Sequence, residues 1–207
     1  NNVLFNKSIS AIRALNIFKS VETEVIDTEN NVEKEINISV EEKPTGEISL
    51  GAGIGSSGAS TFFGVKENNF LGKGQKVKFT STLANTRSTY DLSFTEPYFN
   101  NKPLSLTSQI YSNFSDPSSV NYETEDFGLG LSSAFPLSSD RFLEVRYSLF
   151  TTKIKADADA TNYEKALSGT DTVSMIGHSL SFDRRNSRFK PSRGFNVVLN
   201  QDLAGLG

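Results

Sequence analysis

From Glu47 onward the sequence alternates apolar and polar residues in short runs, and this pattern constrains the fold more than any other feature. In the first run, Ile48, Leu50 and Ile54 alternate with small and polar residues. Side chains of a strand point alternately to its two faces, so each run predicts a strand with one apolar face. No convincing helix follows Glu47. We predict a mostly β, antiparallel structure of about nine strands. The other runs lie near Phe63 and Val65 and within residues 76–83, 90–95, 104–110, 127–135, 143–149, 176–183 and 195–199.

Alternation fits two architectures. In a soluble sandwich the apolar face packs on a second sheet, whereas in a transmembrane barrel it contacts lipid while the polar face lines a wet lumen. Short, compact connectors are expected at one end of the strands and longer loops at the other, which is typical of membrane barrels. Aromatic residues near strand ends also fit the interfacial girdles of a barrel. We therefore favour the barrel. These aromatic residues are Phe62, Phe70, Tyr98, Phe99, Phe135 and Phe150.

The first 44 residues follow a different pattern. Apolar residues recur at helical spacing from Ile9 to Phe18, with Asn6 or Ser8 as a possible N-cap. Two alternating runs come next, so the region is a small α+β unit or the last part of one. A break at "EEKPTG" separates residues 1–44 from residues 45–207, which we treat as two domains. The two runs are residues 21–25 and 36–40, with a polar turn at 28–31.

Composition excludes several classes of protein. The chain has no Cys, which excludes disulfides and thiolate metal sites, and its net charge of −3 gives no indication of nucleic-acid binding. No apolar run approaches the roughly 20 residues that a spanning helix needs, which leaves a β-barrel possible. Both ends of the sequence lie within an element, so we expect a fragment of a longer protein.

Four short motifs resemble functional sites but lack the context that those sites require. Gly53–Gly58 matches the dinucleotide fingerprint G-x-G-x-x-G, yet a Phe-rich strand follows it rather than a helix. Asp157 and Asp159 lack the glycine and the distal glutamate of an EF-hand loop. His178 is the only histidine, and Glu41–Glu42 indicates solvated charge at the joint. We predict no catalytic residues, no cofactor and no metal site, so the protein is not expected to be an enzyme.

Four longer segments carry a family resemblance: "VEEKPTGEISLGAGIGSSG", "ENNFLGKGQKV", "SFTEPYF" and "SFDRRNSRFKPSRGFNVVLNQDLAGLG". In order and spacing they resemble the BamA family, the central barrel subunits of the bacterial outer-membrane protein assembly (BAM) complex. The resemblance implies the C-terminal part of the last periplasmic POTRA domain at 1–44, then the N-terminal strands of an incomplete outer-membrane barrel at 45–207. The matching turn residues are Asn69, Phe70, Leu71, Gly72, Gly74, Glu96, Pro97, Tyr98, Asp183, Arg185, Pro191 and Gly194.

The resemblance also implies a function and partners. It implies insertion of β-barrel proteins into the bacterial outer membrane, with unfolded outer-membrane proteins, accessory lipoproteins, periplasmic chaperones and outer-membrane lipid as partners. The first barrel strand would be a lateral gate that templates an incoming strand by β-augmentation. Its glycines would either keep that seam labile or fit close packing in the lumen. The alternatives are a related POTRA-barrel transporter for autotransporter assembly or two-partner secretion, and a soluble β-sandwich binding module. The lateral-gate strand comprises Glu47, Ile48, Ser49, Leu50, Gly51, Ala52, Gly53, Ile54 and Gly55.

Overall fold

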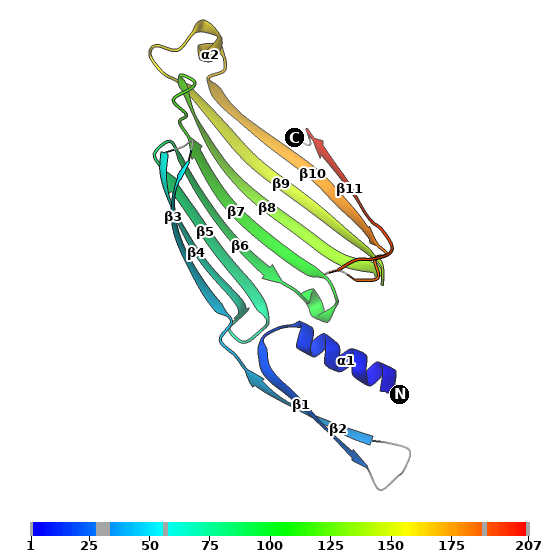
Figure 1. The fold of residues 1–207 in the computed structure, drawn as a ribbon. Coiled ribbons are helices and arrows are strands. Elements are labelled where there is room, and N and C mark those ends of the chain that lie inside the picture. The colour runs from blue at the N-terminus through cyan, green and yellow to red at the C-terminus, as the bar shows by residue number, and fades with distance from the viewer. Residues whose placement is uncertain (1, 28–33, 56–57, 188–189, 206–207) are drawn as a thin grey trace.

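The computed structural model describes residues 2–27, 34–55, 58–187 and 190–205. A small N-terminal unit precedes a large sheet that forms a single curved layer (Figure 1). The small unit consists of helix α1 (Asn2–Ala14) and a two-stranded antiparallel sheet of β1 (Phe18–Asp27) and β2 (Lys34–Glu42). The large sheet consists of β3 (Gly46–Gly55), β4 (Gly58–Phe70), β5 (Gln75–Ala84), β6 (Arg87–Glu96), β7 (Ser105–Ser115), β8 (Tyr122–Ser138), β9 (Arg141–Ala156), β10 (Gly169–Asp183) and β11 (Asn196–Ala204).

The nine strands of the large sheet follow the order of the chain, and each pairs antiparallel with its sequence neighbours. The prediction of nine antiparallel strands is confirmed. Closure into a barrel is not seen in the described residues, because β3 and β11 are opposite edges and do not pair with each other. The architecture is a meander open along two edges.

The register of the sheet places most large apolar side chains on one side of the nine strands and most charged side chains on the other. Directly paired residues point to the same face, so one row runs from Leu50 through Phe63 on β4 to its partners on later strands. We call the two sides the apolar face and the polar face. The apolar face includes Ile48, Leu50, Ile54, Phe63, Val65, Phe79, Leu92, Phe94, Ile110, Leu129, Leu131, Leu149, Ile176 and Leu199, and the polar face includes Glu47, Ser49, Lys66, Lys78, Asp91, Gln109, Asp126, Arg146 and Asp202.

No second layer covers the apolar face among the described residues. Leu50 is 79% exposed and Ile54 is 93% exposed, and the only buried apolar side chains among the described residues are Ile9 and Ala160, both outside the large sheet. A β-sandwich requires a second sheet on this face. The arrangement therefore disagrees with the sandwich alternative and leaves an apolar surface far larger than soluble monomers expose.

The predicted contrast between short turns and long loops is wrong. Connectors 71–74, 97–104, 139–140 and 184–195 lie at the near end, where β3 begins, and connectors 56–57, 85–86, 116–121 and 157–168 lie at the far end. Each end thus carries a two-residue and a twelve-residue connector. The longer loops were expected at residues 115–126 and 155–172, but residues 122–126 and 155–156 are instead strand, since β8 and β9 run for 17 and 16 residues.

The far-end extension of β8 and β9 is held by charged pairs rather than by apolar contacts. Lys153 binds Glu125 at 3.3 Å and Lys155 binds Glu123 at 2.9 Å, one pair above the other on the apolar face of the two strands. These two ion pairs make the far end of the apolar face charged, whereas the rest of that face on β8 and β9 is mostly apolar. Cross-strand ion pairs stabilise strands in water, which explains why pairing continues beyond the apolar band.

Two helices differ from the sequence prediction. Helix α1 is already formed at Asn2, so Asn6 and Ser8 lie inside it rather than at its N-cap, and Phe18 opens β1 instead of ending the helix. The chain leaves α1 at Asn16, whose φ of 57° is left-handed. A second helix, α2 (Asn162–Ala166), was not predicted. The turns predicted at residues 28–31 and at Ser56–Ser57 lie outside the described residues.

Helix α2 begins with a capping box that the sequence contains. The Thr161 hydroxyl accepts from the Glu164 N–H at 3.3 Å, and the Glu164 carboxylate accepts from the Thr161 N–H at 2.8 Å. Glu164 also accepts from the Asn121 N–H at 3.2 Å, which ties this loop to the β7–β8 connector. Hydrogen bonds from the Thr161 N–H and hydroxyl, and then from Asn121, lower the pKa of Glu164 below its usual 4.5.

Candidate functional site: an open strand edge and its supporting turns

Strand β3 is an edge strand that pairs only with β4. All nine residues predicted for the lateral-gate strand, Glu47–Gly55, lie within it, and ten residue pairs join it to β4. On its other side, no described strand accepts the backbone groups that point outward. Such a row of N–H and C=O groups is a template for another strand. Nearly all of β3 is also solvent-exposed, including the apolar Ile48 at 73%.

Three of the four glycines of β3, namely Gly51, Gly53 and Gly55, are not required by packing among the described residues. A Cβ built on Gly51 would lie 3.7 Å from the Phe62 Cβ, and one on Gly53 would lie 3.8 Å from the Ser60 Oγ. Both are ordinary van der Waals distances, and a Cβ on Gly55 would meet nothing within 4 Å. None of the three has a positive φ. Close packing and backbone conformation therefore do not explain these glycines.

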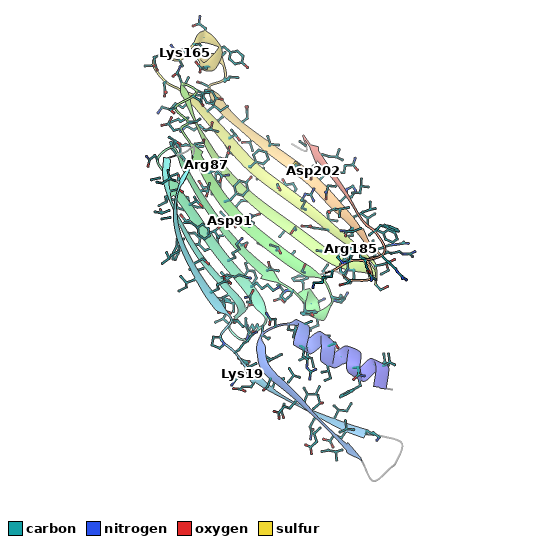
Figure 2. The ribbon with its side chains drawn as sticks, viewed as in Figure 1. Lys19, Arg87, Asp91, Lys165, Arg185 and Asp202 are labelled. Atoms are coloured by element: carbon teal, nitrogen blue, oxygen red, sulfur yellow. The ribbon has the colours of Figure 1, made fainter. Side chains whose placement is uncertain are left out.

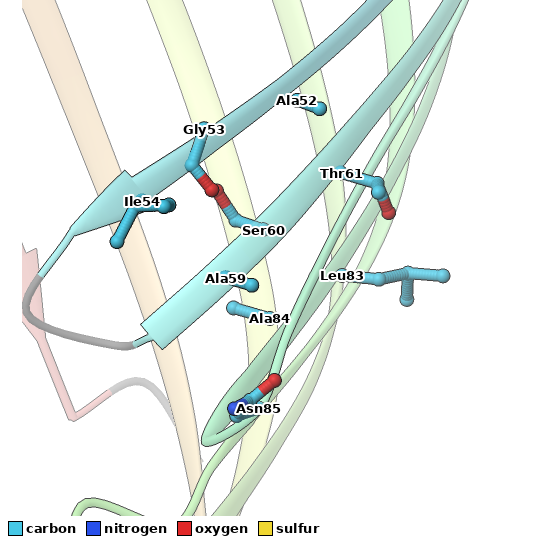
Figure 3. Close-up of a pocket in the computed structure, with 9 residues that line it drawn as sticks. All are labelled: Ala52, Gly53, Ile54, Ala59, Ser60, Thr61, Leu83, Ala84 and Asn85. Carbon is cyan, nitrogen blue, oxygen red and sulfur yellow. The ribbon is translucent and has the colours of Figure 1, made fainter.

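Small side chains continue from β3 onto the far ends of β4 and β5. They line a shallow depression beside the edge, in which Ala52 lies in one row with Thr61 and Leu83 (Figure 3). No charged side chain lines it. Because these side chains are small, the apolar face is shallower next to the outer edge of β3. The depression has no convergent polar groups of the kind that bind small ligands.

A compact set of hydrogen bonds fixes the point where β3 leaves the small unit. The Thr45 hydroxyl donates to the Glu67 carboxylate, and the Asn68 amide donates to the Thr45 carbonyl at 3.2 Å. Glu67 also accepts from the Asn69 N–H at 2.7 Å. No role was predicted from the sequence for Thr45, Glu67 or Asn68. The signal was present, because Asn and Glu next to a Gly-rich turn commonly bond to the turn backbone.

The β4–β5 turn contains the first family motif. The Asn69 side-chain oxygen accepts a hydrogen bond from the Gly74 N–H at 2.7 Å, and the Asn69 backbone carbonyl accepts one from the Gly72 N–H at 2.9 Å. Leu71, Gly72 and Gly74 all have positive φ, between 56° and 71°. Glycine adopts this conformation without strain, which explains two of the motif positions. Phe70 is the last residue of β4.

The second motif lies beside the first. The Glu96 carboxylate accepts from the Gln75 amide at 2.8 Å and from the Tyr98 N–H at 3.1 Å, so it links the β4–β5 and β6–β7 turns. Pro97 and Tyr98 line a groove that also includes Leu15 of the small unit. The structure thus brings together the turn motifs at 69–74 and 96–98 and places them against the end of α1.

The third motif lies at the same end of the strands but toward the opposite edge. Arg185 donates to Asp183 through Nε and Nη2, both at 2.8 Å. Gly194 has a φ of +94°, and a Cβ there would overlap the Arg184 carbonyl oxygen. Pro191 is exposed within the connector. Asp183, Arg185 and Gly194 therefore shape one turn, and they are not near β3.

Polar side chains on the polar face bind one another across strands. Arg146 on β9 reaches over β10 to Asp202 on β11, at 3.0 Å through Nε and 2.6 Å through Nη2. Gly177 lies directly between them in the register, and a Cβ there would overlap the Asp202 carboxylate. Thr152 on β9 donates at 2.7 Å to Asp126, its direct partner on the adjacent β8. The sequence predicted this face but not these pairs.

The short motifs that resemble functional sites in the sequence form no such site in the described part of the chain. His178 is half-buried on the apolar face opposite Gln201, and no group of three metal-ligating side chains occurs within the described ranges. Gly53–Gly55 continue β3 instead of opening a phosphate loop. Among the described helices, neither is long and apolar enough to cross a membrane.

A single-layer antiparallel meander with an uncovered apolar face and a polar opposite face defines the class of outer-membrane β-barrel proteins. The Omp85 superfamily domain matches residues 69–207, which is more than half of the sequence, and the chain belongs to that superfamily. This membership agrees with the predicted resemblance.

Individual relatives agree with the family assignment. The chain is 28% identical over 190 residues to the outer membrane protein assembly factor BamA of Neorickettsia risticii, covering 90% of this chain and 25% of that protein. It superposes on the crystal structure of BamA from Haemophilus ducreyi lacking POTRA domains 1-3 with a TM-score of 0.73 at 20% identity, covering 96% of this chain and 41% of the other. CdiB from Acinetobacter baumannii gives a TM-score of 0.53 at 11% identity, covering 93% and 39%. The chain thus spans about a quarter of the curated relative.

Proposed function

We propose that this chain is part of a factor that assembles and inserts β-barrel proteins into the bacterial outer membrane. In this proposal β3 is the strand at which an incoming substrate strand is added, by β-augmentation through its free backbone edge. The observation that carries the proposal is this edge itself: a glycine-rich strand with one unpaired side, on a single-layer sheet with an uncovered apolar face.

Physical chemistry supports a membrane role for the sheet. Apolar side chains with no covering layer are stable when acyl chains contact them, and the hydrogen-bonded polar face then encloses water. An unpaired backbone group in hydrocarbon costs several kcal/mol. The open edge of β3 therefore has a strong tendency to capture another strand. This tendency is what a strand-templating factor requires.

The N-terminal unit completes the proposed arrangement. We assign residues 1–44 to the C-terminal part of a POTRA domain and residues 45–207 to the first strands of a barrel. With β3 starting at the near end, the small unit and the 71–74 and 97–104 turns would face the periplasm. Unfolded outer-membrane proteins, periplasmic chaperones and accessory lipoproteins would approach from this side. The groove beside Tyr98 and Leu15 lies where such a partner would meet both parts of the chain.

A secretion pore of the same superfamily is the second candidate. The likeness to CdiB supports it, since CdiB shares the fold. Its superposition is the weaker of the two, with a TM-score of 0.53 against 0.73 for BamA. A pore would transport a partner through the lumen and would leave β3 paired. The two functions therefore differ in whether a substrate strand pairs with β3.

Site-specific crosslinking tests the proposal directly: residues 1–207 contain no Cys, and any Cys elsewhere in the full-length protein would first be replaced by Ser. A Ser49→Cys variant of the full-length protein would be mixed with a barrel substrate that carries one Cys in its terminal strand. We expect a disulfide in the assembly reaction. The matched control is Ser93→Cys, which is also half-buried on the polar face but lies on β6, a strand paired on both sides. Equal crosslinking at both positions would refute strand addition at β3.

A separate experiment tests membrane embedding. A fluorescent label on Ile110→Cys, on the apolar face, should be quenched by lipid-borne spin labels. The same label on the adjacent Gln109→Cys should be quenched by iodide in water. Quenching of both positions by iodide alone would show that the apolar face does not contact lipid, and the proposed function would fail with it.

A further inference from the structure

A cationic corner lies where the apolar face ends at the near end of β9, β10 and β11. Arg141 and Arg184 both place their guanidinium carbon 5.2 Å from the centre of the Phe182 ring. The Phe182 ring in turn packs against Phe195 at 5.5 Å. The register places Arg141 directly opposite Phe182 on the apolar face. We call these four residues the arginine–phenylalanine corner.

The two arginines of the corner differ in their carboxylate partners. The Arg184 Nε donates to Asp140 at 2.9 Å, whereas no carboxylate contacts the Arg141 guanidinium among the described residues. The corner as a whole is basic. Across described residues 139–141, 183–187 and 190–195 there are five Arg or Lys side chains and two Asp side chains. The Arg141 guanidinium is exposed and held on an aromatic ring, and its positive charge is not neutralised by any carboxylate that the structure describes. Such a group favours an anionic ligand.

We propose that the arginine–phenylalanine corner binds the phosphate group of an anionic phospholipid. This inference rests on the proposed membrane function, because only then does the corner lie at the level of lipid head groups. Arginine forms paired, charge-assisted hydrogen bonds to phosphate oxygens. Aromatic rings and arginines at the border of an apolar band lie where acyl chains meet head groups.

The geometry favours a lipid over a soluble anion or an acidic peptide. Phe182 and Phe195 are continuous with the apolar face through Leu180 and Val197, so one ligand can contact the rings with its acyl chain and the arginines with its phosphate. Free phosphate would use only the charges. An acidic peptide would gain nothing from the apolar rows beside the rings.

Lipid retention measured by native mass spectrometry tests the inference on the full-length protein. The detergent-solubilised protein would be offered phosphatidylglycerol and phosphatidylcholine with the same acyl chains. We expect preferential retention of phosphatidylglycerol, and a loss of about tenfold in its apparent affinity for Arg141→Gln, which is the effect of one charge-assisted contact. Arg141→Lys should retain part of the affinity, because the charge stays but the planar fork is lost.

The matched control is Arg87→Gln, which removes the same charge at the far end of the sheet, away from the corner (Figure 2). This variant should retain phosphatidylglycerol as the wild type does. Each variant is checked for folding by its heat-dependent gel mobility. If folded Arg141→Gln retains phosphatidylglycerol unchanged, or if the wild type shows no preference, the inference is wrong.

Competition identifies the ligand and separates this inference from the proposed function. Inorganic phosphate and an acidic peptide would each be added as competitors of the bound lipid. If inorganic phosphate displaces the lipid, or if the acidic peptide displaces it more effectively than added phosphatidylglycerol does, the assignment to a lipid is wrong. If the labels at Ile110 and Gln109 show membrane embedding and Ser49→Cys crosslinks to substrate, absence of lipid preference would refute only the corner. Failure of those two tests would instead refute the proposed function.

Discussion

The glycines of β3 allow a quantitative test of whether a weak edge strand is needed for assembly. We consider the double variant Gly51→Val and Gly53→Val in the full-length protein. A Cβ at these positions lies 3.7 Å from the Phe62 Cβ and 3.8 Å from the Ser60 Oγ, so on the polar face it meets only ordinary van der Waals contacts. The substitution therefore changes strand propensity without a clash.

The expected magnitude follows from that propensity. Replacing a strand glycine by a β-branched residue stabilises the extended conformation by up to about 1 kcal/mol. Two replacements therefore stabilise β3 pairing by about 1–2 kcal/mol, which is a factor of about 5–30 in an equilibrium constant. If β3 must release a strand bound at its outer edge, on the side away from β4, before it accepts a substrate strand there, the assembly rate should fall by a similar factor.

Assembly is measured as the rate at which an unfolded barrel protein gains its folded gel mobility in proteoliposomes that contain the variant. The control is Gly130→Val on β8, where a Cβ would also meet only ordinary contacts, at 3.5 Å from Gln109. This central strand is paired on both sides, so its stiffening should leave the rate unchanged. An unchanged rate in the β3 variant, with β3 shown to be folded, would refute the argument that a labile edge limits assembly.

Three other perturbations have outcomes that follow from single contacts. Gly177→Ala would overlap the Asp202 carboxylate, so we expect the free energy of unfolding of the full-length protein in urea to fall by about 1–3 kcal/mol, and by much less in an Asp202→Ala background, which removes the overlapping group. Hydrogen bonds from Ser138 and then Arg184 hold the pKa of Asp140 below its usual 3.8, so the stabilisation from these contacts should persist from neutral pH to about pH 4 and be lost as the pH falls further below 3.8; the difference in thermal stability between wild type and Asp140→Asn should shrink over that range. Thr161→Ala removes the capping box of α2 and should cost about 1 kcal/mol of local stability, measured as faster amide hydrogen exchange in the loop.

The large sheet could be predicted from the sequence because period-2 alternation reports directly on which face a side chain occupies. Leu50, Leu92 and Leu129 were all assigned to apolar faces, and they lie on one continuous face in the structure. The glycines of the turns could also be predicted from the sequence. Gly72 and Gly74 have the positive φ that turn glycines supply.

Contacts between distant strands could not be predicted in this way. Arg146 and Asp202 are 56 residues apart, and alternation fixes the face of each without fixing the register that brings them together. The predicted lengths of the loops were wrong for a related reason. Strands β8 and β9 continue past the apolar band because Glu123 and Lys155 pair across them, and a charged run without apolar residues resembles a loop in sequence. The capping box at Thr161 was readable and was missed.

The outermost strands of the described sheet, β3 and β11, differ in how firmly each is held to its neighbour. Strand β3 contains Gly51, Gly53 and Gly55 within ten residues, whereas β11 contains no glycine. Strand β11 is also held by the Arg146–Asp202 ion pair, which spans β10 and so resists separation of two strand pairs at once. Separating β11 from the sheet must break this contact as well as backbone hydrogen bonds, while separating β3 from β4 breaks a ladder weakened by glycine. Lability is therefore concentrated at β3, which is the edge where the proposed function places strand addition.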